Sequence, residues 1–169
     1  MLFGLCQEAC HHEINYLLWR ALCKANVPSV KEPSGLVRVD GKLPDGSTLI
    51  PWHSGKAMAW EVTVVNTLAK SYLTLSASPG GAAEHAAARK SAKYSSLPPS
   101  HTFQPLALET LRPINSTGIS FFTELGRRLS DVSGDCRETT YLFQRVFLAV
   151  QHHNSVAFKG TFTVLTELD

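Results

Sequence analysis

The alternation of hydrophobic and polar positions divides the chain into helical and extended stretches. Between residues 7 and 26, apolar residues recur at helical spacing and NVPS follows them, which predicts a first helix. Three strand-like runs come next, each bounded by turn-forming residues: LVRV (36–39), STLIPW (47–52) and AMAWEVTVV (57–65). Only HSGK joins the last two runs, so we expect them to pair in antiparallel fashion.

The second half of the chain returns to helical spacing. An alanine-rich stretch predicts a helix over roughly 81–97, which PPSH ends. The run TFQPLALETL (102–111) predicts a fourth strand. Pro105 lacks an amide hydrogen, so this strand is expected at an edge of the sheet or with a bulge.

Two further helices are expected after the fourth strand. STGISFFTELGRRL (116–129) is amphipathic, and its apolar side is predicted to carry Ile119, Phe122, Leu125 and Leu129. In DCRE, Asp135 precedes Glu138 by three residues, which predicts a capping box that opens a last helix through about Asn154.

The order helix, three strands, helix, strand, two helices predicts an α/β or α+β domain, with a mixed sheet flanked by helices. At 169 residues and 44% hydrophobic composition, the chain is long enough for one domain with its own core. No apolar run approaches the roughly 20 residues that span a bilayer, so no membrane partner is expected. The N-terminus is too short in its apolar part for a secretory signal, which favours an intracellular setting with four free cysteine thiols.

The stretch KLPDGSTLIPWHSGKAMAWEV contains candidate functional residues. It places the acid Glu61 inside an otherwise apolar strand. If the two runs in it pair, Asp45 at the start of the first lies near Glu61 at the end of the second. Two carboxylates, with the carbonyl of Val62 as a further oxygen, suit Mg²⁺. Such an ion activates water and offsets charge on a phosphodiester. The alternative is that Asp45 is a turn residue and Glu61 a solvated strand residue.

The same residues carry a family resemblance. Pro44-Asp45 followed by Glu61-Val62-Thr63 resembles the PD-(D/E)XK nuclease pattern. That family usually has a lysine two residues after the second acid, where this chain has Thr63. Some branches move the lysine to the next helix, and AAARKSAKY offers such residues here.

Longer segments extend the resemblance over about residues 4–156. EPSGLVRVDGKLPDGSTLIPWHSGKAMAWEVTVVNTLAKSY, FQPLALETLRPINSTGISFFTELGRRL and FQRVFLAVQHHNS resemble the restriction-like endonuclease domain that follows the reverse transcriptase in proteins derived from non-LTR retroelements. The resemblance implies a nuclear DNA endonuclease that nicks DNA so that a reverse transcriptase in the same polyprotein can prime. The restriction-like domain would span 13–156, followed by a C-terminal tail, 157–169.

Site roles follow from the resemblance only. Asp45 and Glu61 would bind Mg²⁺ or Mn²⁺, and Glu32 could add an outer carboxylate. A helical cation would orient or activate the attacking water. The residues implied on that helix are Lys93 for this role, Lys90 as its rival, and Tyr94 packing beside it.

The N-terminus offers a second set of ligands. Cys6, Cys10, His11 and His12 are residue types that suit Zn²⁺. Related retroelement proteins carry a Cys/His zinc-binding segment before this domain, so residues 1–12 could be its remnant, with Cys6, Cys10 and His12 as an incomplete site. The alternative is an ordinary helix surface.

Two other functions stay open at this point. One is a degenerate copy that keeps the fold and binds nucleic acid or a protein without cleaving. The other is a small zinc-supported interaction module.

Overall fold

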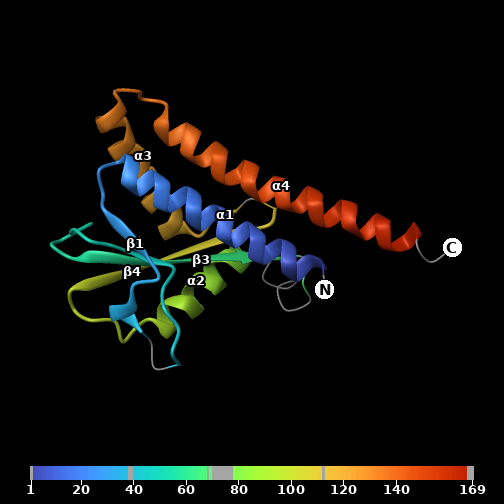
Figure 1. The fold of residues 1–169 in the computed structure, drawn as a ribbon, viewed down its shortest axis with the longest axis horizontal. Coiled ribbons are helices and arrows are strands. Elements are labelled where there is room, and N and C mark those ends of the chain that lie inside the picture. The colour runs from blue at the N-terminus through green and yellow to red at the C-terminus, as the bar shows by residue number, and fades with distance from the viewer. Residues whose placement is uncertain (1, 38–39, 68, 70–77, 112, 167–169) are drawn as a thin grey trace.

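The computed structural model describes residues 2–37, 40–67, 69, 78–111 and 113–166. The order of element types is the predicted one, and the α/β layered fold is confirmed (Figure 1). The elements are α1 (Leu2–Lys24), β1 (Ser29–Lys31), the 3-10 helix η1 (Ser34–Leu36), β2 (Gly46–Thr48), β3 (Ala57–Val65), α2 (Gly81–Lys93), β4 (His101–Glu109), α3 (Ser116–Ser133) and α4 (Glu138–Thr166).

The four strands form one mixed sheet in the order β1-β2-β3-β4. β2 pairs with β1 and β3 in antiparallel fashion, whereas β3 and β4 are parallel. The predicted antiparallel pair is therefore present at the centre of the sheet. β4 is an edge strand, as Pro105 indicated, and Pro105 lies opposite Glu61 in the ladder.

Helices cover both faces of the sheet. Figure 1 shows α1, α3 and α4 on one side and α2 on the other. Alternation along β3 sends Met58, Trp60 and Val62 into the large core under α1, α3 and α4. Val65 packs instead against α2, whose buried alanines form the second, smaller cluster. Because alanine side chains are small, α2 can lie close to the sheet.

The first two predicted strands need correction. Of LVRV, Leu36 lies in η1, and residues 38 and 39 lie outside the described residues. The first strand that the structure describes is Ser29–Lys31, a short segment without a hydrophobic pattern. STLIPW forms strand only at its start. The Thr48 hydroxyl accepts the amide of Met58 at 3.0 Å and donates to the carbonyl of Ile50, so a side chain ends the backbone ladder there.

The predicted apolar side of α3 is correct except at Ile119. Phe122, Leu125 and Leu129 are buried, but Ile119 is 47% exposed and Phe121 packs into the core. The α3 stripe is thus rotated slightly relative to the predicted one.

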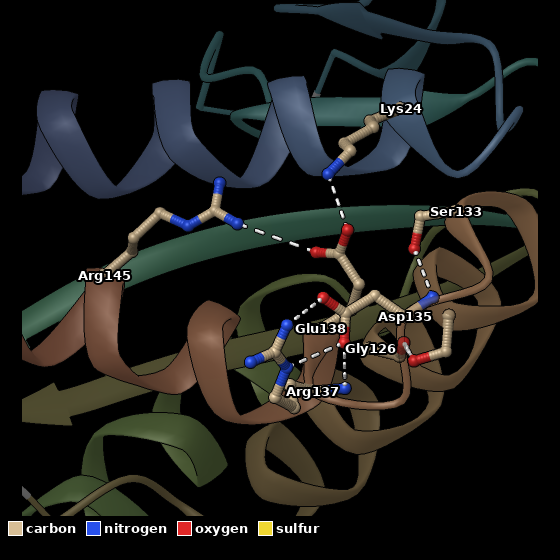
Figure 2. A network of polar contacts seen from close by, with 8 residues as sticks. Lys24, Gly126, Ser133, Asp135, Arg137, Glu138 and Arg145 are labelled. Carbon is tan, nitrogen blue, oxygen red and sulfur yellow. Dashed lines mark hydrogen bonds and ion pairs between the residues drawn. The ribbon is translucent and has the colours of Figure 1, made fainter.

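The predicted capping box does not form. The Asp135 carboxylate accepts the amide of Arg137 at 2.9 Å, but the amide of Asp135 donates to Ser133, not to Glu138. The buried Glu138 carboxylate instead accepts Lys24 at 2.7 Å and pairs with Arg145 at 3.7 Å, which ties α1 to α4 (Figure 2). α4 also continues past Asn154 to Thr166.

In the part of the chain that the structure describes, no helix combines the length and the apolar character needed to cross a membrane.

Candidate functional site

Asp45 lies directly before β2 and reaches across to β3. Its Oδ2 accepts the backbone amide of Val62 at 2.7 Å and His11 Nε2 at 2.9 Å. Gly46 pairs with Trp60 in the ladder, so Asp45 lies next to the strand position of Glu61. The start of the first central strand and the far part of the second therefore meet, as the sequence predicts.

Gly46 explains why the chain can place Asp45 there. The φ angle of Gly46 is not among the positive values found at Gly41, Gly55, Gly80 and Gly134, so this residue is not a turn glycine. A Cβ at Gly46 would lie 2.1 Å from the Trp60 indole, which is fully buried. Only glycine lets the strand approach this ring so closely.

Glu61 is a mostly buried acid that is paired with a cation. Its Oε1 forms an ion pair with Lys90 Nζ from α2, and the two side chains are 12% and 27% exposed. A buried carboxylate is costly unless it is paired, so Lys90 accounts for an acid in an otherwise apolar strand.

The two acids share one arrangement. In each carboxylate, the protein holds one oxygen: Asp45 Oδ2 by Val62 and His11, and Glu61 Oε1 by Lys90. The other oxygen of each has no hydrogen-bond donor among the described residues, and Glu61 Oε2 is buried without a partner. The site thus has two acceptor oxygens that no described side chain uses.

His11 brings α1 into the site. Its side chain is 26% exposed. The hydrogen bond to Asp45 raises the pKa of His11, burial opposes this, and the charges of Asp45 and Glu61 add to the rise, while Lys90 lowers it. Asp45, Glu61 and Lys90 therefore all act electrostatically on His11, although the four residues come from four separate segments.

The structure favours Lys90 over Lys93. Lys93 and Arg89 are exposed, whereas Lys90 and Tyr94 share the side of the helix that faces the sheet. The sequence prediction preferred Lys93 as the cation beside the two acids. The structure corrects this choice to Lys90. Tyr94 donates to the carbonyl of Leu43 at 3.1 Å and stacks on Phe103, so it holds the loop that leads to Asp45.

Glu32 and Val62 contribute through their backbones. The amide of Glu32 donates to the Asp45 carbonyl at 3.0 Å, and its side chain is exposed, so no outer carboxylate is placed on the acid pair. The amide of Val62 donates to Asp45. The Val62 carbonyl as a further metal oxygen stays a prediction.

The cysteine and histidine set does not come together. Cys6 and Cys10 line a pocket of about 540 Å³ between α1 and α4, while His12 is exposed on the outside of α1. Burial and, less strongly, the charge of Glu13 raise the pKa of Cys10 to about 11, which keeps it a neutral thiol and a poor ligand. Across the described residues, no group of three or more His, Cys, Asp or Glu side chains is placed to hold a metal ion. All four cysteines are free thiols, as predicted.

The sequence does not predict the role of His11. Its neighbours Cys6, Cys10 and His12 indicate a zinc ligand instead. The helical spacing of Gln7, His11 and Asn15, three polar residues four apart, was the available signal that one polar line of α1 faces the sheet.

No protein-family model matches the chain, and no curated protein matches it in sequence. A function for this chain is therefore inferred from the geometry of the site and from the sequence resemblance.

Proposed function

We propose that the chain is a metal-dependent endonuclease domain of the PD-(D/E)XK type that nicks DNA, with Asp45 and Glu61 as the metal ligands. The observation that carries this proposal is the shared arrangement of the two acids. One oxygen of each is held by the protein, and the other has no donor among the described residues.

The donor set fits a hard divalent cation. Mg²⁺ and Mn²⁺ prefer oxygen ligands, and Mg²⁺ is commonly bound through one or two carboxylates together with water and substrate phosphate. When bound, such an ion activates water and offsets charge on the phosphodiester. Asp45 Oδ1 and Glu61 Oε2 are the atoms that would hold it.

Lys90 supplies the cation that Thr63 does not. Thr63 is two residues after Glu61 on the same face of β3, and its hydroxyl is buried without a partner among the described residues. Lys90 reaches Glu61 from α2 instead. In the proposed reaction its ammonium orients the attacking water and stabilises negative charge that develops on the phosphate.

The wider setting belongs to the same proposal and is supported by the resemblance. The domain would act in the nucleus, beside a reverse transcriptase from the same retroelement-derived polyprotein. The nick would supply the primer end for that enzyme.

A non-catalytic copy that binds nucleic acid is the second candidate. The observation that favours it is the Glu61–Lys90 ion pair, since a cation bound by the protein itself already neutralises one of the two acids. In this alternative the ion pair joins α2 to β3 and stabilises the fold, and the chain cuts no DNA.

Plasmid nicking separates the two candidates. The purified chain is expected to nick supercoiled DNA with Mg²⁺ or Mn²⁺ and not with EDTA. Asp45→Asn and Glu61→Gln should each abolish nicking while the proteins stay folded by circular dichroism. Asp131→Asn, an exposed acid paired with Arg127 on α3, is the matched control and should keep full activity. Equal nicking by all four proteins, or by none, would reject the endonuclease proposal.

A further inference from the structure

We infer that His11 is a positioning residue of this site: it fixes the Asp45 carboxylate so that Oδ1 is the oxygen available to a cation. The inference rests on the proposed function. His11 does not contact the scissile phosphate in this scheme; it acts through Asp45.

The contact itself defines the direction of the hydrogen bond. An ionised carboxylate only accepts hydrogen bonds, so His11 Nε2 carries the proton and donates to Asp45 Oδ2 at 2.9 Å. The amide of Val62 donates to the same oxygen at 2.7 Å. Two donors from two different elements meet on one oxygen, which removes the freedom of the carboxylate to rotate or to exchange its oxygens.

α1 holds His11 rigidly in this position. Gln7 Nε2 donates to the carbonyl of Val64 at 2.9 Å, one turn before His11. The indole of Trp60 donates to Asn15 Oδ1 at 2.9 Å, one turn after it. His11 is therefore the middle member of a polar line on α1 that is fastened to β3 on both sides.

A group that holds a metal ligand in place by a hydrogen bond contributes strongly to the affinity of the site for the metal. Loss of such a partner commonly lowers metal affinity or activity by about 10- to 100-fold. A residue that only filled space between α1 and the sheet would change stability and leave metal affinity as it was.

The test uses three substitutions at His11. The amide nitrogen of Gln lies where histidine has Nε2, so His11→Gln keeps the donor. His11→Asn places its nitrogen nearer the position of Nδ1, and His11→Leu has no donor. His12→Leu is the matched control, because His12 is the adjacent histidine and is exposed.

Two measurements are made on each variant and on the wild type. Mn²⁺ binding is titrated by electron paramagnetic resonance, and hydrogen exchange of the Val62 amide is followed by NMR without metal. We expect His11→Leu and His11→Asn to bind Mn²⁺ about 10- to 100-fold more weakly and to exchange the Val62 amide faster. His11→Gln and His12→Leu should match the wild type in both.

The outcomes separate this inference from the proposed function. If Asp45→Asn abolishes Mn²⁺ binding while His11→Leu and His11→Asn leave it unchanged, the positioning role is overturned and the metal site stands. If the wild type binds no Mn²⁺, the metal site and the positioning role fall together. If His11→Leu does not fold, the comparison of His11→Asn with His11→Gln decides in the same way.

Discussion

Lys90 and Lys93 lie on the same helix and have different surroundings. The first is in an ion pair with Glu61, and the second is exposed. A cation held beside the reacting groups acts on developing charge, whereas an exposed one adds only to general attraction for a polyanion. This contrast allows the two roles to be separated by single substitutions.

We expect Lys90→Ala to lower the single-turnover nicking rate at saturating DNA by about 100- to 1,000-fold. Lys93→Ala should leave this rate unchanged. Thr63→Lys in the Lys90→Ala background is the rescue variant. It returns an amine to the face of β3 that carries Glu61. Equal rates for the two single variants would assign Lys90 a purely structural role.

Gly46→Ala tests the close packing that sets Asp45. A Cβ would overlap the buried Trp60 indole, and overpacking of this kind costs about 1–3 kcal/mol in the free energy of unfolding. Urea unfolding followed by Trp fluorescence measures the loss. Gly35→Ala is the control, since a Cβ at Gly35 meets nothing within 4 Å. The lower unfolded-state entropy of alanine should keep or slightly raise stability there. A loss of equal size at Gly35 would mean that the loss at Gly46 does not come from the indole.

At the scale of elements, α2 is the basic edge of the site. Arg89 and Lys93 lie one turn apart on its exposed side, next to Lys90. Its single acid, Glu84, accepts the amide of Ser116 at the start of α3. The exposed charge along this side is therefore positive, which suits contact with a phosphate backbone.

Arg89→Ala and Lys93→Ala should each reduce the salt dependence of DNA binding. Each phosphate contact contributes about 0.9 to the slope of log K against log salt. The slope should fall by about that amount per variant, measured by fluorescence anisotropy over a salt series. Arg20→Ala, an exposed arginine on α1, should leave the slope as it is; an equal change there would mean that DNA binds without using α2.

Glu138 links α1 to α4 and gives the fold a pH dependence. Hydrogen bonding to Lys24 lowers the pKa of the Glu138 carboxyl from its ordinary value of 4.5, against the effect of burial. Because its pKa is lower in the folded state than in the unfolded chain, the ionised carboxylate stabilises the fold above about pH 4.5. This contribution is lost as the pH falls through the lowered folded-state value.

Glu138→Gln is therefore expected to be less stable than the wild type at pH 7, with a difference that shrinks as the pH falls below 4.5. Denaturant unfolding across this pH range measures the effect. Asp131→Gln changes an exposed acid on α3 and should show no comparable pH-dependent difference. A constant gap for Glu138→Gln at all pH values would contradict the role of the ionised group.

Hydrophobic periodicity predicts where most helices and strands lie. It does not predict a role that depends on a partner far away in the sequence. SVK is a strand because it pairs with β2, although its composition is that of a loop. Glu138 has the spacing of a capping residue, but a lysine more than a hundred positions away binds it. Local sequence patterns do not predict contacts with such distant residues.

At the scale of the molecule, the site is assembled from both layers and from the sheet between them. α1 supplies His11, the loop before β2 supplies Asp45, β3 supplies Glu61 and α2 supplies Lys90. The sequence predicted the two acids because a short hairpin joins their strands. It could not choose Lys90 or find His11, because those choices depend on how two helices are rotated against opposite faces of the sheet.

A cation bound in this site should stabilise the whole fold. Mn²⁺ at about 100 times its dissociation constant adds about 2.7 kcal/mol to the free energy of unfolding. Thermal unfolding of the wild type should therefore shift upward with Mn²⁺ and return with EDTA. The shift should vanish in Asp45→Asn and persist in Asp131→Asn; a shift that survives in Asp45→Asn would place the ion elsewhere.

The Glu61–Lys90 pair also bears on how such a protein changes during evolution. Removal of Lys90 leaves a carboxylate that is largely buried and unpaired, which is costly to the fold whether or not the protein cuts DNA. A lineage released from selection for cleavage would thus still be under purifying selection to keep both residues. Substitutions should accumulate first at His11 and Asp45. Retention of Glu61 and Lys90 alone therefore does not indicate that the protein still cleaves DNA.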